Sequence, residues 1–205
     1  MSPFARVGAK LIERGFSAIP IIPGSKRPGF NGRGLFDWQT RYSERLATEL
    51  EIEHWSRADA GVGVVAGPAS GDLVGIDIDT EDKEMVAALW GVLPPTPVHM
   101  AGQKGSTLFF RGPGIASQSF NVGGRRFVGI IGAGRQTVLP PTIHPSTGQP
   151  YRWCGEIALE NIDPSELPEL PSNVASLIAN ALTPFGYSEE PIRAPARGDM
   201  GAADT

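Results

Sequence analysis

The sequence predicts an α+β fold, because its strand-like segments cluster in the middle of the chain and helix-like segments lie at both ends. Residues 2–15 repeat apolar side chains such as Phe4 and Leu11 at the spacing of an amphipathic helix. Residues 61–153 instead contain short β-rich runs that are separated by glycine-rich turns. Strands grouped in this way favour α+β over a regularly alternating βαβ fold.

The segment before these strands is expected to contain one strand, one irregular loop and a second helix. The run SAIPIIP at residues 17–23 is predicted to be a short buried strand, and the glycines and prolines of residues 24–38 are expected to prevent regular structure. Ser43 is the predicted N-cap of a helix that continues to about Trp55, with Leu50 facing the core.

The strand-rich segment begins with two apolar runs, GVGVVAG at residues 61–67 and LVGIDID at residues 73–79. The connection GPASGD has the residue types of a hairpin turn, so the two runs are expected to pair with each other. A helix is predicted at residues 81–90, and a last one at residues 172–182. The other predicted strands are TLFFRG, RRFVGII, QTVLPP and PYRW.

Composition is that of a compact globular protein. The chain has 205 residues, of which 40% are hydrophobic and 20% are charged, which excludes disordered, collagenous and membrane classes. Charged residues interrupt the apolar positions of the N-terminal helix, so neither a signal peptide nor a membrane span is predicted. Cys154 is the one cysteine, which excludes an internal disulfide and makes a cytoplasmic location the expectation.

Charge is distributed unevenly, although the formal net charge of the chain is -4. Between Met85 and Gly155 the sequence contains neither aspartate nor glutamate. The basic residues of this segment are Lys104, Arg111, Arg125, Arg126, Arg135 and Arg152. We expect a positive field there, of the kind that attracts phosphate groups.

Asp77 and Asp79 end the apolar run LVGIDID and are the strongest candidates for chemistry. Residues i and i+2 of a strand share one face, roughly 6.5–7 Å apart, so the two carboxylates are expected to lie together. Because two ionised carboxylates repel each other, they favour a hard divalent cation such as Mg²⁺, which takes oxygen ligands and serves phosphoryl transfer. The structural alternative is that they close the strand and cap the following helix.

The same run also fits the Asp-x-Asp-x-Thr pattern of haloacid-dehalogenase-like phosphatases over residues 74–80. In such an enzyme Asp77 would be the nucleophile and Asp79 the acid. These phosphatases need further aspartates downstream, but the next aspartate after Asp82 is Asp163, without the expected Gly-Asp-x-x-x-Asp arrangement. The phosphatase interpretation is therefore the weaker one.

Four motifs stand in order over about residues 5–155. They are IPIIPGSKRPGF, GVGVVAGPASGDLVGIDIDTED, KGSTLFFRG and GAGRQTVLPPTIHPSTGQPYRW. Together they resemble the N-terminal catalytic domain of bifunctional DNA primase/polymerases, which belong to the archaeo-eukaryotic primase superfamily and are common in phages and plasmids.

This resemblance implies a catalytic domain at residues 1–186, with an RRM-like sheet at about residues 60–155 and a small flanking α/β lobe. It implies nucleotide transfer from nucleoside triphosphates to DNA on a template, with Mg²⁺ or Mn²⁺. Residues 187–205 are expected to form a disordered tail or linker, because the sequence from Ser188 onward has few large apolar side chains. A tail of this kind commonly leads into a further domain, for which a helicase is the candidate.

The resemblance assigns metal binding and catalysis to Asp77 and Asp79. A third carboxylate of the family falls on Gly129, which has no ligand atom. Mg²⁺ uses waters and substrate phosphates as further ligands, so binding can survive this loss, whereas catalysis is expected to suffer. The alternative function is therefore a module of the same fold that binds nucleotide or DNA without turnover.

Phosphate contacts are also implied by the resemblance. Thr107 stands where the family usually has a histidine, so we expect neighbouring cations to strengthen the binding of the triphosphate. The nucleotide-binding candidates are Lys26, Lys104, Thr107, Arg111, Arg135, Gln136 and His144. The plain alternatives are a solvated turn lysine, a strand threonine, a surface arginine and a structural histidine.

Overall fold

The structure, a computed structural model, describes residues 1–102 and 104–188. Its helices are α1 (Pro3–Glu13), α2 (Trp38–Glu44), α3 (Glu49–Arg57), α4 (Lys83–Val92) and α5 (Val174–Leu182). Its strands are β1 (Ala18–Ile21), β2 (Gly29–Phe30), β3 (Arg33–Gly34), β4 (Gly61–Val65), β5 (Leu73–Ile78), β6 (His99–Ala101), β7 (Ser106–Arg111), β8 (Gln118–Val122), β9 (Arg125–Ile131), β10 (Gln136–Leu139) and β11 (Arg152–Trp153). Short 3-10 helices lie at Pro68–Ser70, Leu159–Asn161, Pro164–Glu166 and Thr183–Phe185.

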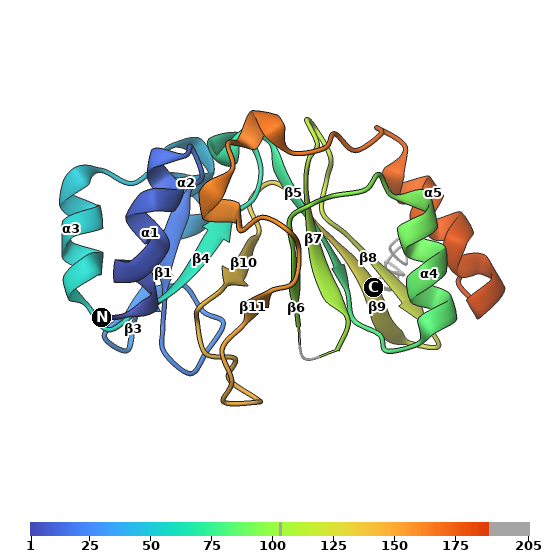
Figure 1. Cartoon of the computed structure of the whole chain (residues 1–205), viewed down its shortest axis with the longest axis horizontal. Coiled ribbons are helices and arrows are strands. Elements are labelled where there is room, and N and C mark those ends of the chain that lie inside the picture. Colours follow the sequence, from blue (N-terminus) through green and yellow to red (C-terminus); the bar gives the residue numbers. More distant parts are fainter. Residues whose placement is uncertain (103, 189–205) are drawn as a thin grey trace, which may run out of the picture.

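Two antiparallel sheets form the body of the molecule. β4 lies between β1 and β10 in the three-stranded sheet, and the six-stranded sheet has the order β11-β6-β7-β5-β9-β8. β5 and β6 run in the same direction on either side of β7 and are joined by α4, which is the arrangement of an RRM-like sheet. The first three helices accompany the small sheet, and α4 and α5 accompany the large one (Figure 1). The predicted α+β fold is therefore confirmed.

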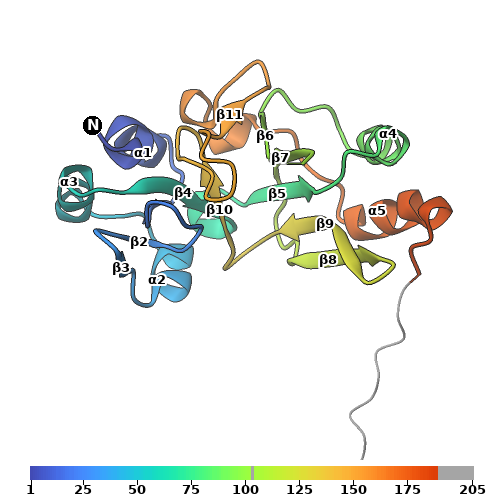
Figure 2. The ribbon, with the colours of Figure 1, turned by 90° about the horizontal axis from the view of Figure 1, so that it is seen from below.

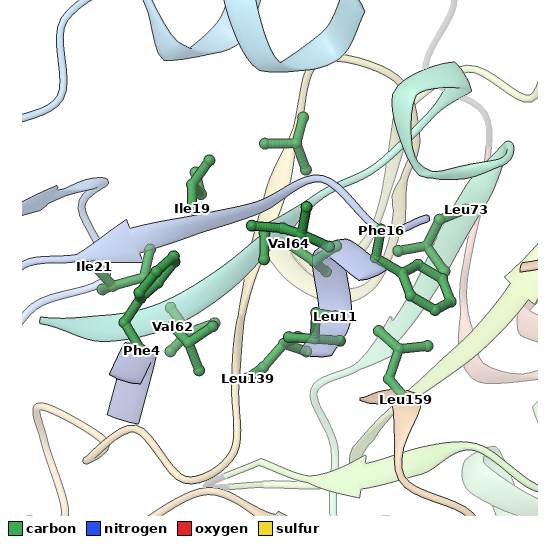
Figure 3. Packing of buried hydrophobic residues seen from close by; sticks show 14 of the residues in the cluster. Phe4, Leu11, Phe16, Ile19, Ile21, Val62, Val64, Leu73, Leu139 and Leu159 are labelled. Atoms are coloured by element: carbon green, nitrogen blue, oxygen red, sulfur yellow. The ribbon is translucent and has the colours of Figure 1, made fainter. Parts of the chain in front are cut away.

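The three-stranded sheet is held together by an apolar core with α1 on one side. α1 begins where Ser2 accepts a hydrogen bond from the Ala5 amide, and its apolar residues follow at helical spacing, as predicted. Phe4 and Leu11 are fully buried, and Phe4 lies beside the strand residues Ile21 and Val62 (Figure 3). α2 and the small β2–β3 hairpin lie on the opposite side of β4 from α1 (Figure 2).

The six-stranded sheet has a second apolar core on the face that α4 and α5 cover. Val74, Ile76 and Ile78 of β5 are buried in this core. Alternation along the strand therefore turns Leu73 and Asp77 to the other face, which is the face toward the three-stranded sheet. β5 thus packs one apolar face into the core, and on its other face Asp77 points into the space between the sheets.

The second predicted helix is placed incorrectly by the sequence. Ser43 lies inside α2 rather than at an N-cap, and its hydroxyl bonds back to the Gln39 carbonyl. The structure has two helices here, and Thr48 caps α3 through a capping box with Glu51. Leu50, expected in the core, is 78% exposed.

The predicted hairpin between the runs at residues 61–67 and 73–79 is also wrong beyond its base, where Gly67 and Leu73 form a single antiparallel bridge. β4 and β5 belong to different sheets and are linked through the 3-10 turn at Pro68–Ser70. β4 instead pairs with β1 and with the distant β10, a long-range choice that the turn residues do not encode. Two further differences are the β2–β3 hairpin in a segment expected to be irregular and the strands β6 and β8, which the sequence did not indicate.

The C-terminal part of the fold ends in contact with the large sheet. Tyr187 packs against Phe120 of β8 with ring centroids 5.6 Å apart. The predicted disordered tail lies, from residue 189 onward, outside the described residues, and the domain limits of 1–186 stay a prediction. Within the described ranges, the helices all fall short of the length and apolar character needed to cross a membrane.

Candidate active site

A cleft of about 520 Å³ lies between the two sheets. β5, β7 and β9 of the six-stranded sheet line one side of it, and β10 with two neighbouring loops lines the other. The predicted site residues that line this cleft are Lys26, Asp77, Asp79, Lys104, Thr107, Arg135, Gln136 and His144. The structure therefore brings together residues that are as far as 118 positions apart in the sequence.

The central strand β5 positions the aspartate pair at the mouth of this cleft. At the start of the strand, Leu73 is buried in the core between the sheets, which fixes the orientation of that face. Asp77 follows on the same face and is directly opposite Thr107 of β7 and Gly129 of β9. Because these two neighbours are small, the strand end stays open and the Asp77 side chain remains 27% exposed.

Both oxygens of Asp77 already have hydrogen-bond partners. Oδ1 accepts from the Thr107 hydroxyl at 3.0 Å, and Oδ2 accepts from Nη2 of Arg126 at 2.8 Å. Asp79 comes just after the strand, where its amide donates to the Phe127 carbonyl at 2.8 Å. Within the described residues the carboxylate of Asp79 has no hydrogen bond or ion pair, so it is free to take a ligand.

Gly129 occupies the position at which the resemblance implies a third carboxylate. A Cβ atom at this residue would lie 3.2 Å from Nη1 of Arg126 and 4.0 Å from Cβ of Asp77. The space above the glycine is therefore taken by the Arg126 guanidinium. The positively charged guanidinium of Arg126 thus occupies the place where a third carboxylate was expected. Arg126 is not among the site residues that the sequence predicts.

A β-bulge explains why Arg126 faces the cleft. Phe120 of β8 is paired with Val128, but the next residue of β8 is paired with Arg126. Phe127 is thus an extra residue on β9, and it packs against the apolar core under α4 and α5. Strict alternation would place Arg126 on the same face as Val128, whereas the bulge turns it to the cleft face.

The other cations come from three separate loops. The loop that carries Lys26 is tied to β10, because Nε2 of Gln136 donates to the Lys26 carbonyl at 2.8 Å. Lys104 is in the β6–β7 turn, where Gly105 has a φ of +67° and lies so close to β5 that a Cβ would be 2.1 Å from the Ile78 carbonyl oxygen. Arg135 follows the turn after β9. Among the described residues, the lining combines four Lys or Arg side chains with two carboxylates.

His144 and Tyr151 line the same cleft as these cations. Their rings lie 5.0 Å apart, and Nδ1 of His144 accepts a hydrogen bond from the Ser146 amide at 3.1 Å. Burial, with a smaller effect from the charge of Lys26, lowers the pKa of His144, so the neutral ring carries its proton on Nε2 and can donate it. Burial and the charge of Asp77 raise the pKa of Tyr151 to about 12. Tyr151 was not predicted, because nothing in its sequence context distinguishes it from a core tyrosine.

Arg111 is the predicted nucleotide-binding residue that the structure does not bring to the cleft. It is at the far end of β7 from Thr107, directly opposite Leu73. Its guanidinium forms an ion pair with Glu169. It is four positions along the strand from Thr107, which is about 13 Å, so the shared face does not make the two residues neighbours.

The aspartate pair fits a hard divalent cation. The alternative role of helix cap is taken by Asp82, whose carboxylate accepts from the amides of Glu84 and Met85. Across residues 1–102 and 104–188 no group of three or more His, Cys, Asp or Glu side chains is placed to hold a metal. Mg²⁺ is commonly bound through one or two carboxylates together with substrate phosphates, a donor set that Asp77 and Asp79 can supply.

Comparison with protein-family models matches residues 8–172 to the family described as bifunctional DNA primase/polymerase, N-terminal. A search of curated proteins found no match. The matched region contains both sheets and all the residues of the cleft. The chain therefore belongs to the family of N-terminal domains of bifunctional DNA primase/polymerases.

Proposed function

We propose that the cleft binds a nucleoside triphosphate with Mg²⁺ or Mn²⁺ and transfers a nucleotide to the 3′-hydroxyl of a DNA strand on a template. Family membership indicates a function of the primase/polymerase type. The observation that carries the proposal is the juxtaposition of Asp77 and Asp79 with four Lys or Arg side chains among the described residues of one cleft. A metal–triphosphate complex carries both signs of charge and matches this distribution.

Asp77 and Asp79 would hold the divalent cation. When bound, the cation supplies positive charge that neutralises phosphate oxygens during transfer. Lys26, Lys104 and Arg135 line the same cleft and would bind and orient the triphosphate. The neutral His144 would donate a further hydrogen bond from Nε2. The phosphates would then be held by the charges of the cations and by a directional hydrogen bond.

DNA template and primer are the second substrate in this proposal. The acid-free segment from Met85 to Gly155 contributes the six-stranded sheet apart from β5, which lets a polyanion approach with little repulsion. The setting we propose is DNA replication of the phage or plasmid type.

Primer extension with Mn²⁺ tests the proposal. Asp77→Asn is expected to lower the extension rate at least about a hundredfold, because it removes charge from the cation site while the side chain keeps its size. The matched control is Asp72→Asn, the same change at the other end of β5. Asp72 has a φ of +64°, which asparagine tolerates, so this variant should extend primers like the wild type. Equal rates for all three proteins would contradict the proposal.

A second candidate function is nucleotide or DNA binding without turnover. Gly129, with Arg126 beside it, favours this alternative, because neither residue can ligate a metal. Gly129→Asp restores a carboxylate opposite Asp77 and separates the two candidates. A gain of extension activity in this variant supports an enzyme weakened at one ligand, whereas unchanged binding with no turnover supports the binding module.

A further inference from the structure

The Arg126 side chain lies in the cleft, where it forms an ion pair with Asp77 and fills the space above Gly129. Its Nη2 donates to Oδ2 of Asp77 at 2.8 Å, and its Nη1 lies 3.2 Å from the position of a Cβ at residue 129. A divalent cation bound by Asp77 would therefore meet a guanidinium that already neutralises the same carboxylate. Two positive groups compete for one anion.

The Asp77–Arg126 pair has the features of an exchangeable contact. One nitrogen meets one oxygen, so the pair does not use the bidentate geometry of which arginine is capable. The Arg126 side chain is 47% exposed, and exposed pairs of this kind shift an equilibrium by about fivefold or less. The other side chain on Asp77, Thr107, is neutral and stays bonded to Oδ1 when the arginine leaves.

A released Arg126 would remain inside the cleft. It is anchored at the bulge of β9, opposite Asn121 of β8, and its Nη1 lies close to the cleft residue Gly129, so only the end of the side chain needs to move. Its planar guanidinium, once free of Asp77, presents a fork of donors that matches phosphate oxygens. The Arg126 guanidinium can thus pair with Asp77 when the cleft is empty and with phosphate oxygens when a nucleotide is bound.

We propose that Arg126 is an exchangeable internal cation, which pairs with Asp77 in the empty cleft and passes to the triphosphate when a divalent cation binds at Asp77. This inference rests on the proposed function. It predicts that Arg126 lowers the affinity of the chain for a divalent cation when no nucleotide is present. It also predicts that the metal and the nucleotide each raise the affinity for the other, because the metal frees Arg126 for the nucleotide and the nucleotide draws Arg126 away from Asp77.

Binding of Mn²⁺ alone, measured by electron paramagnetic resonance of free Mn²⁺, tests the first half of the proposal without any turnover. Arg126→Gln keeps the length of the side chain and removes its charge, so the affinity for Mn²⁺ should rise about fivefold. Arg125→Gln is the matched control. Arg125 is the preceding residue of β9, its guanidinium lies over the Phe127 ring, and it does not line the cleft. This control should bind Mn²⁺ like the wild type.

Calorimetry with a nucleoside triphosphate in the presence of Mn²⁺ tests the second half. Arg126→Gln should weaken nucleotide binding about fivefold, opposite in direction to its effect on Mn²⁺ alone. If Arg126→Gln fails to fold, Gly129→Ala replaces it. The added Cβ would lie 3.2 Å from Nη1 of Arg126, so the guanidinium has to shift by a few tenths of an ångström while it keeps its charge, and Mn²⁺ affinity should rise by less than in Arg126→Gln.

The outcomes separate this inference from the proposed function. Opposite changes in Mn²⁺ and nucleotide affinity support the exchange. If the wild type binds Mn²⁺ and nucleotide but Arg126→Gln changes neither affinity, or lowers both, Arg126 is a fixed structural partner and the inference is wrong while the proposed function stands. If neither the wild type nor the variants bind Mn²⁺ or nucleotide, both proposals are wrong.

Discussion

Two arginine–carboxylate pairs in this molecule differ in how many hydrogen bonds the carboxylate accepts. In the lobe of the three-stranded sheet, Glu51 receives both Nη1 and Nη2 of Arg45 at 2.8 Å. It also accepts from the Tyr42 hydroxyl and from the backbone amide and hydroxyl of Thr48. In the cleft, Asp77 has one arginine nitrogen and one threonine hydroxyl.

A structural carboxylate therefore differs from one that is available for ligands in how many of its acceptor positions are filled. The hydrogen bonds from Arg45 contribute most to holding the pKa of Glu51 far below its usual range. Burial, helped by Glu51, raises the pKa of Tyr42 to about 12, so the group stays a fixed donor. Glu51 has its acceptor positions filled and organises α2 and α3. Asp77 accepts two hydrogen bonds and the Asp79 carboxylate, within the described residues, accepts none, which is why we propose this pair for the cation.

The largest effect expected on stability comes from Glu51→Gln. The amide presents donors toward Arg45 and Tyr42, which are donors themselves, so several partly buried hydrogen bonds are lost together. We expect the free energy of unfolding to fall by about 2 kcal/mol. Urea denaturation of the variant and the wild type measures this change. A loss below about 0.5 kcal/mol would show that the Glu51 network is not structural.

A second prediction concerns acid. The pKa of Glu51 is lowered by folding, so the carboxylate contributes its stability fully above its ordinary pKa of 4.5 and loses it as the pH falls toward the lowered value. The unfolding free energy of the wild type should therefore decrease as the pH drops below 4.5. In Glu51→Gln this part of the decrease should be missing. Parallel pH curves for the two proteins would contradict the assignment.

The smallest effect is expected at the cleft pair. Thr107→Val keeps the β-branched shape in the strand and removes the hydroxyl that donates to Asp77. Because Asp77 is partly exposed and water can replace the lost donor, the free energy of unfolding should fall by about 0.5–1 kcal/mol. A loss as large as that of Glu51→Gln would mean that Asp77 is as fully engaged as the structural carboxylate.

Local signals explain which parts of the fold the sequence predicts. The spacing of Phe4 and Leu11 specifies α1, and the apolar run before Asp77 specifies β5. The start of α3 was predicted at Ser43 because single capping residues are ambiguous. The pattern Thr48-x-x-Glu51 is the more specific signal, since it satisfies two backbone amides at once. The pairing of β4 with β10 depends on residues far apart in the chain and has no local signal.

The site follows the same rule. The motifs place eight predicted residues in the cleft, because each motif ends a strand or forms a turn that faces the space between the sheets. Arg126 was missed because the bulge at Phe127 reverses the alternation from which its direction would be inferred. Arg111 was misplaced because a shared strand face says nothing about distance along the strand.

The most direct test of the account is calorimetric titration of a nucleoside triphosphate into the wild type and Asp77→Asn, with and without Mn²⁺ and without DNA. Mn²⁺ should raise the nucleotide affinity of the wild type at least about tenfold, and Asp77→Asn should abolish this increase while Asp72→Asn retains it. A nucleotide affinity that is independent of Mn²⁺, or an equal increase in Asp77→Asn, would contradict a metal–nucleotide site at the end of β5.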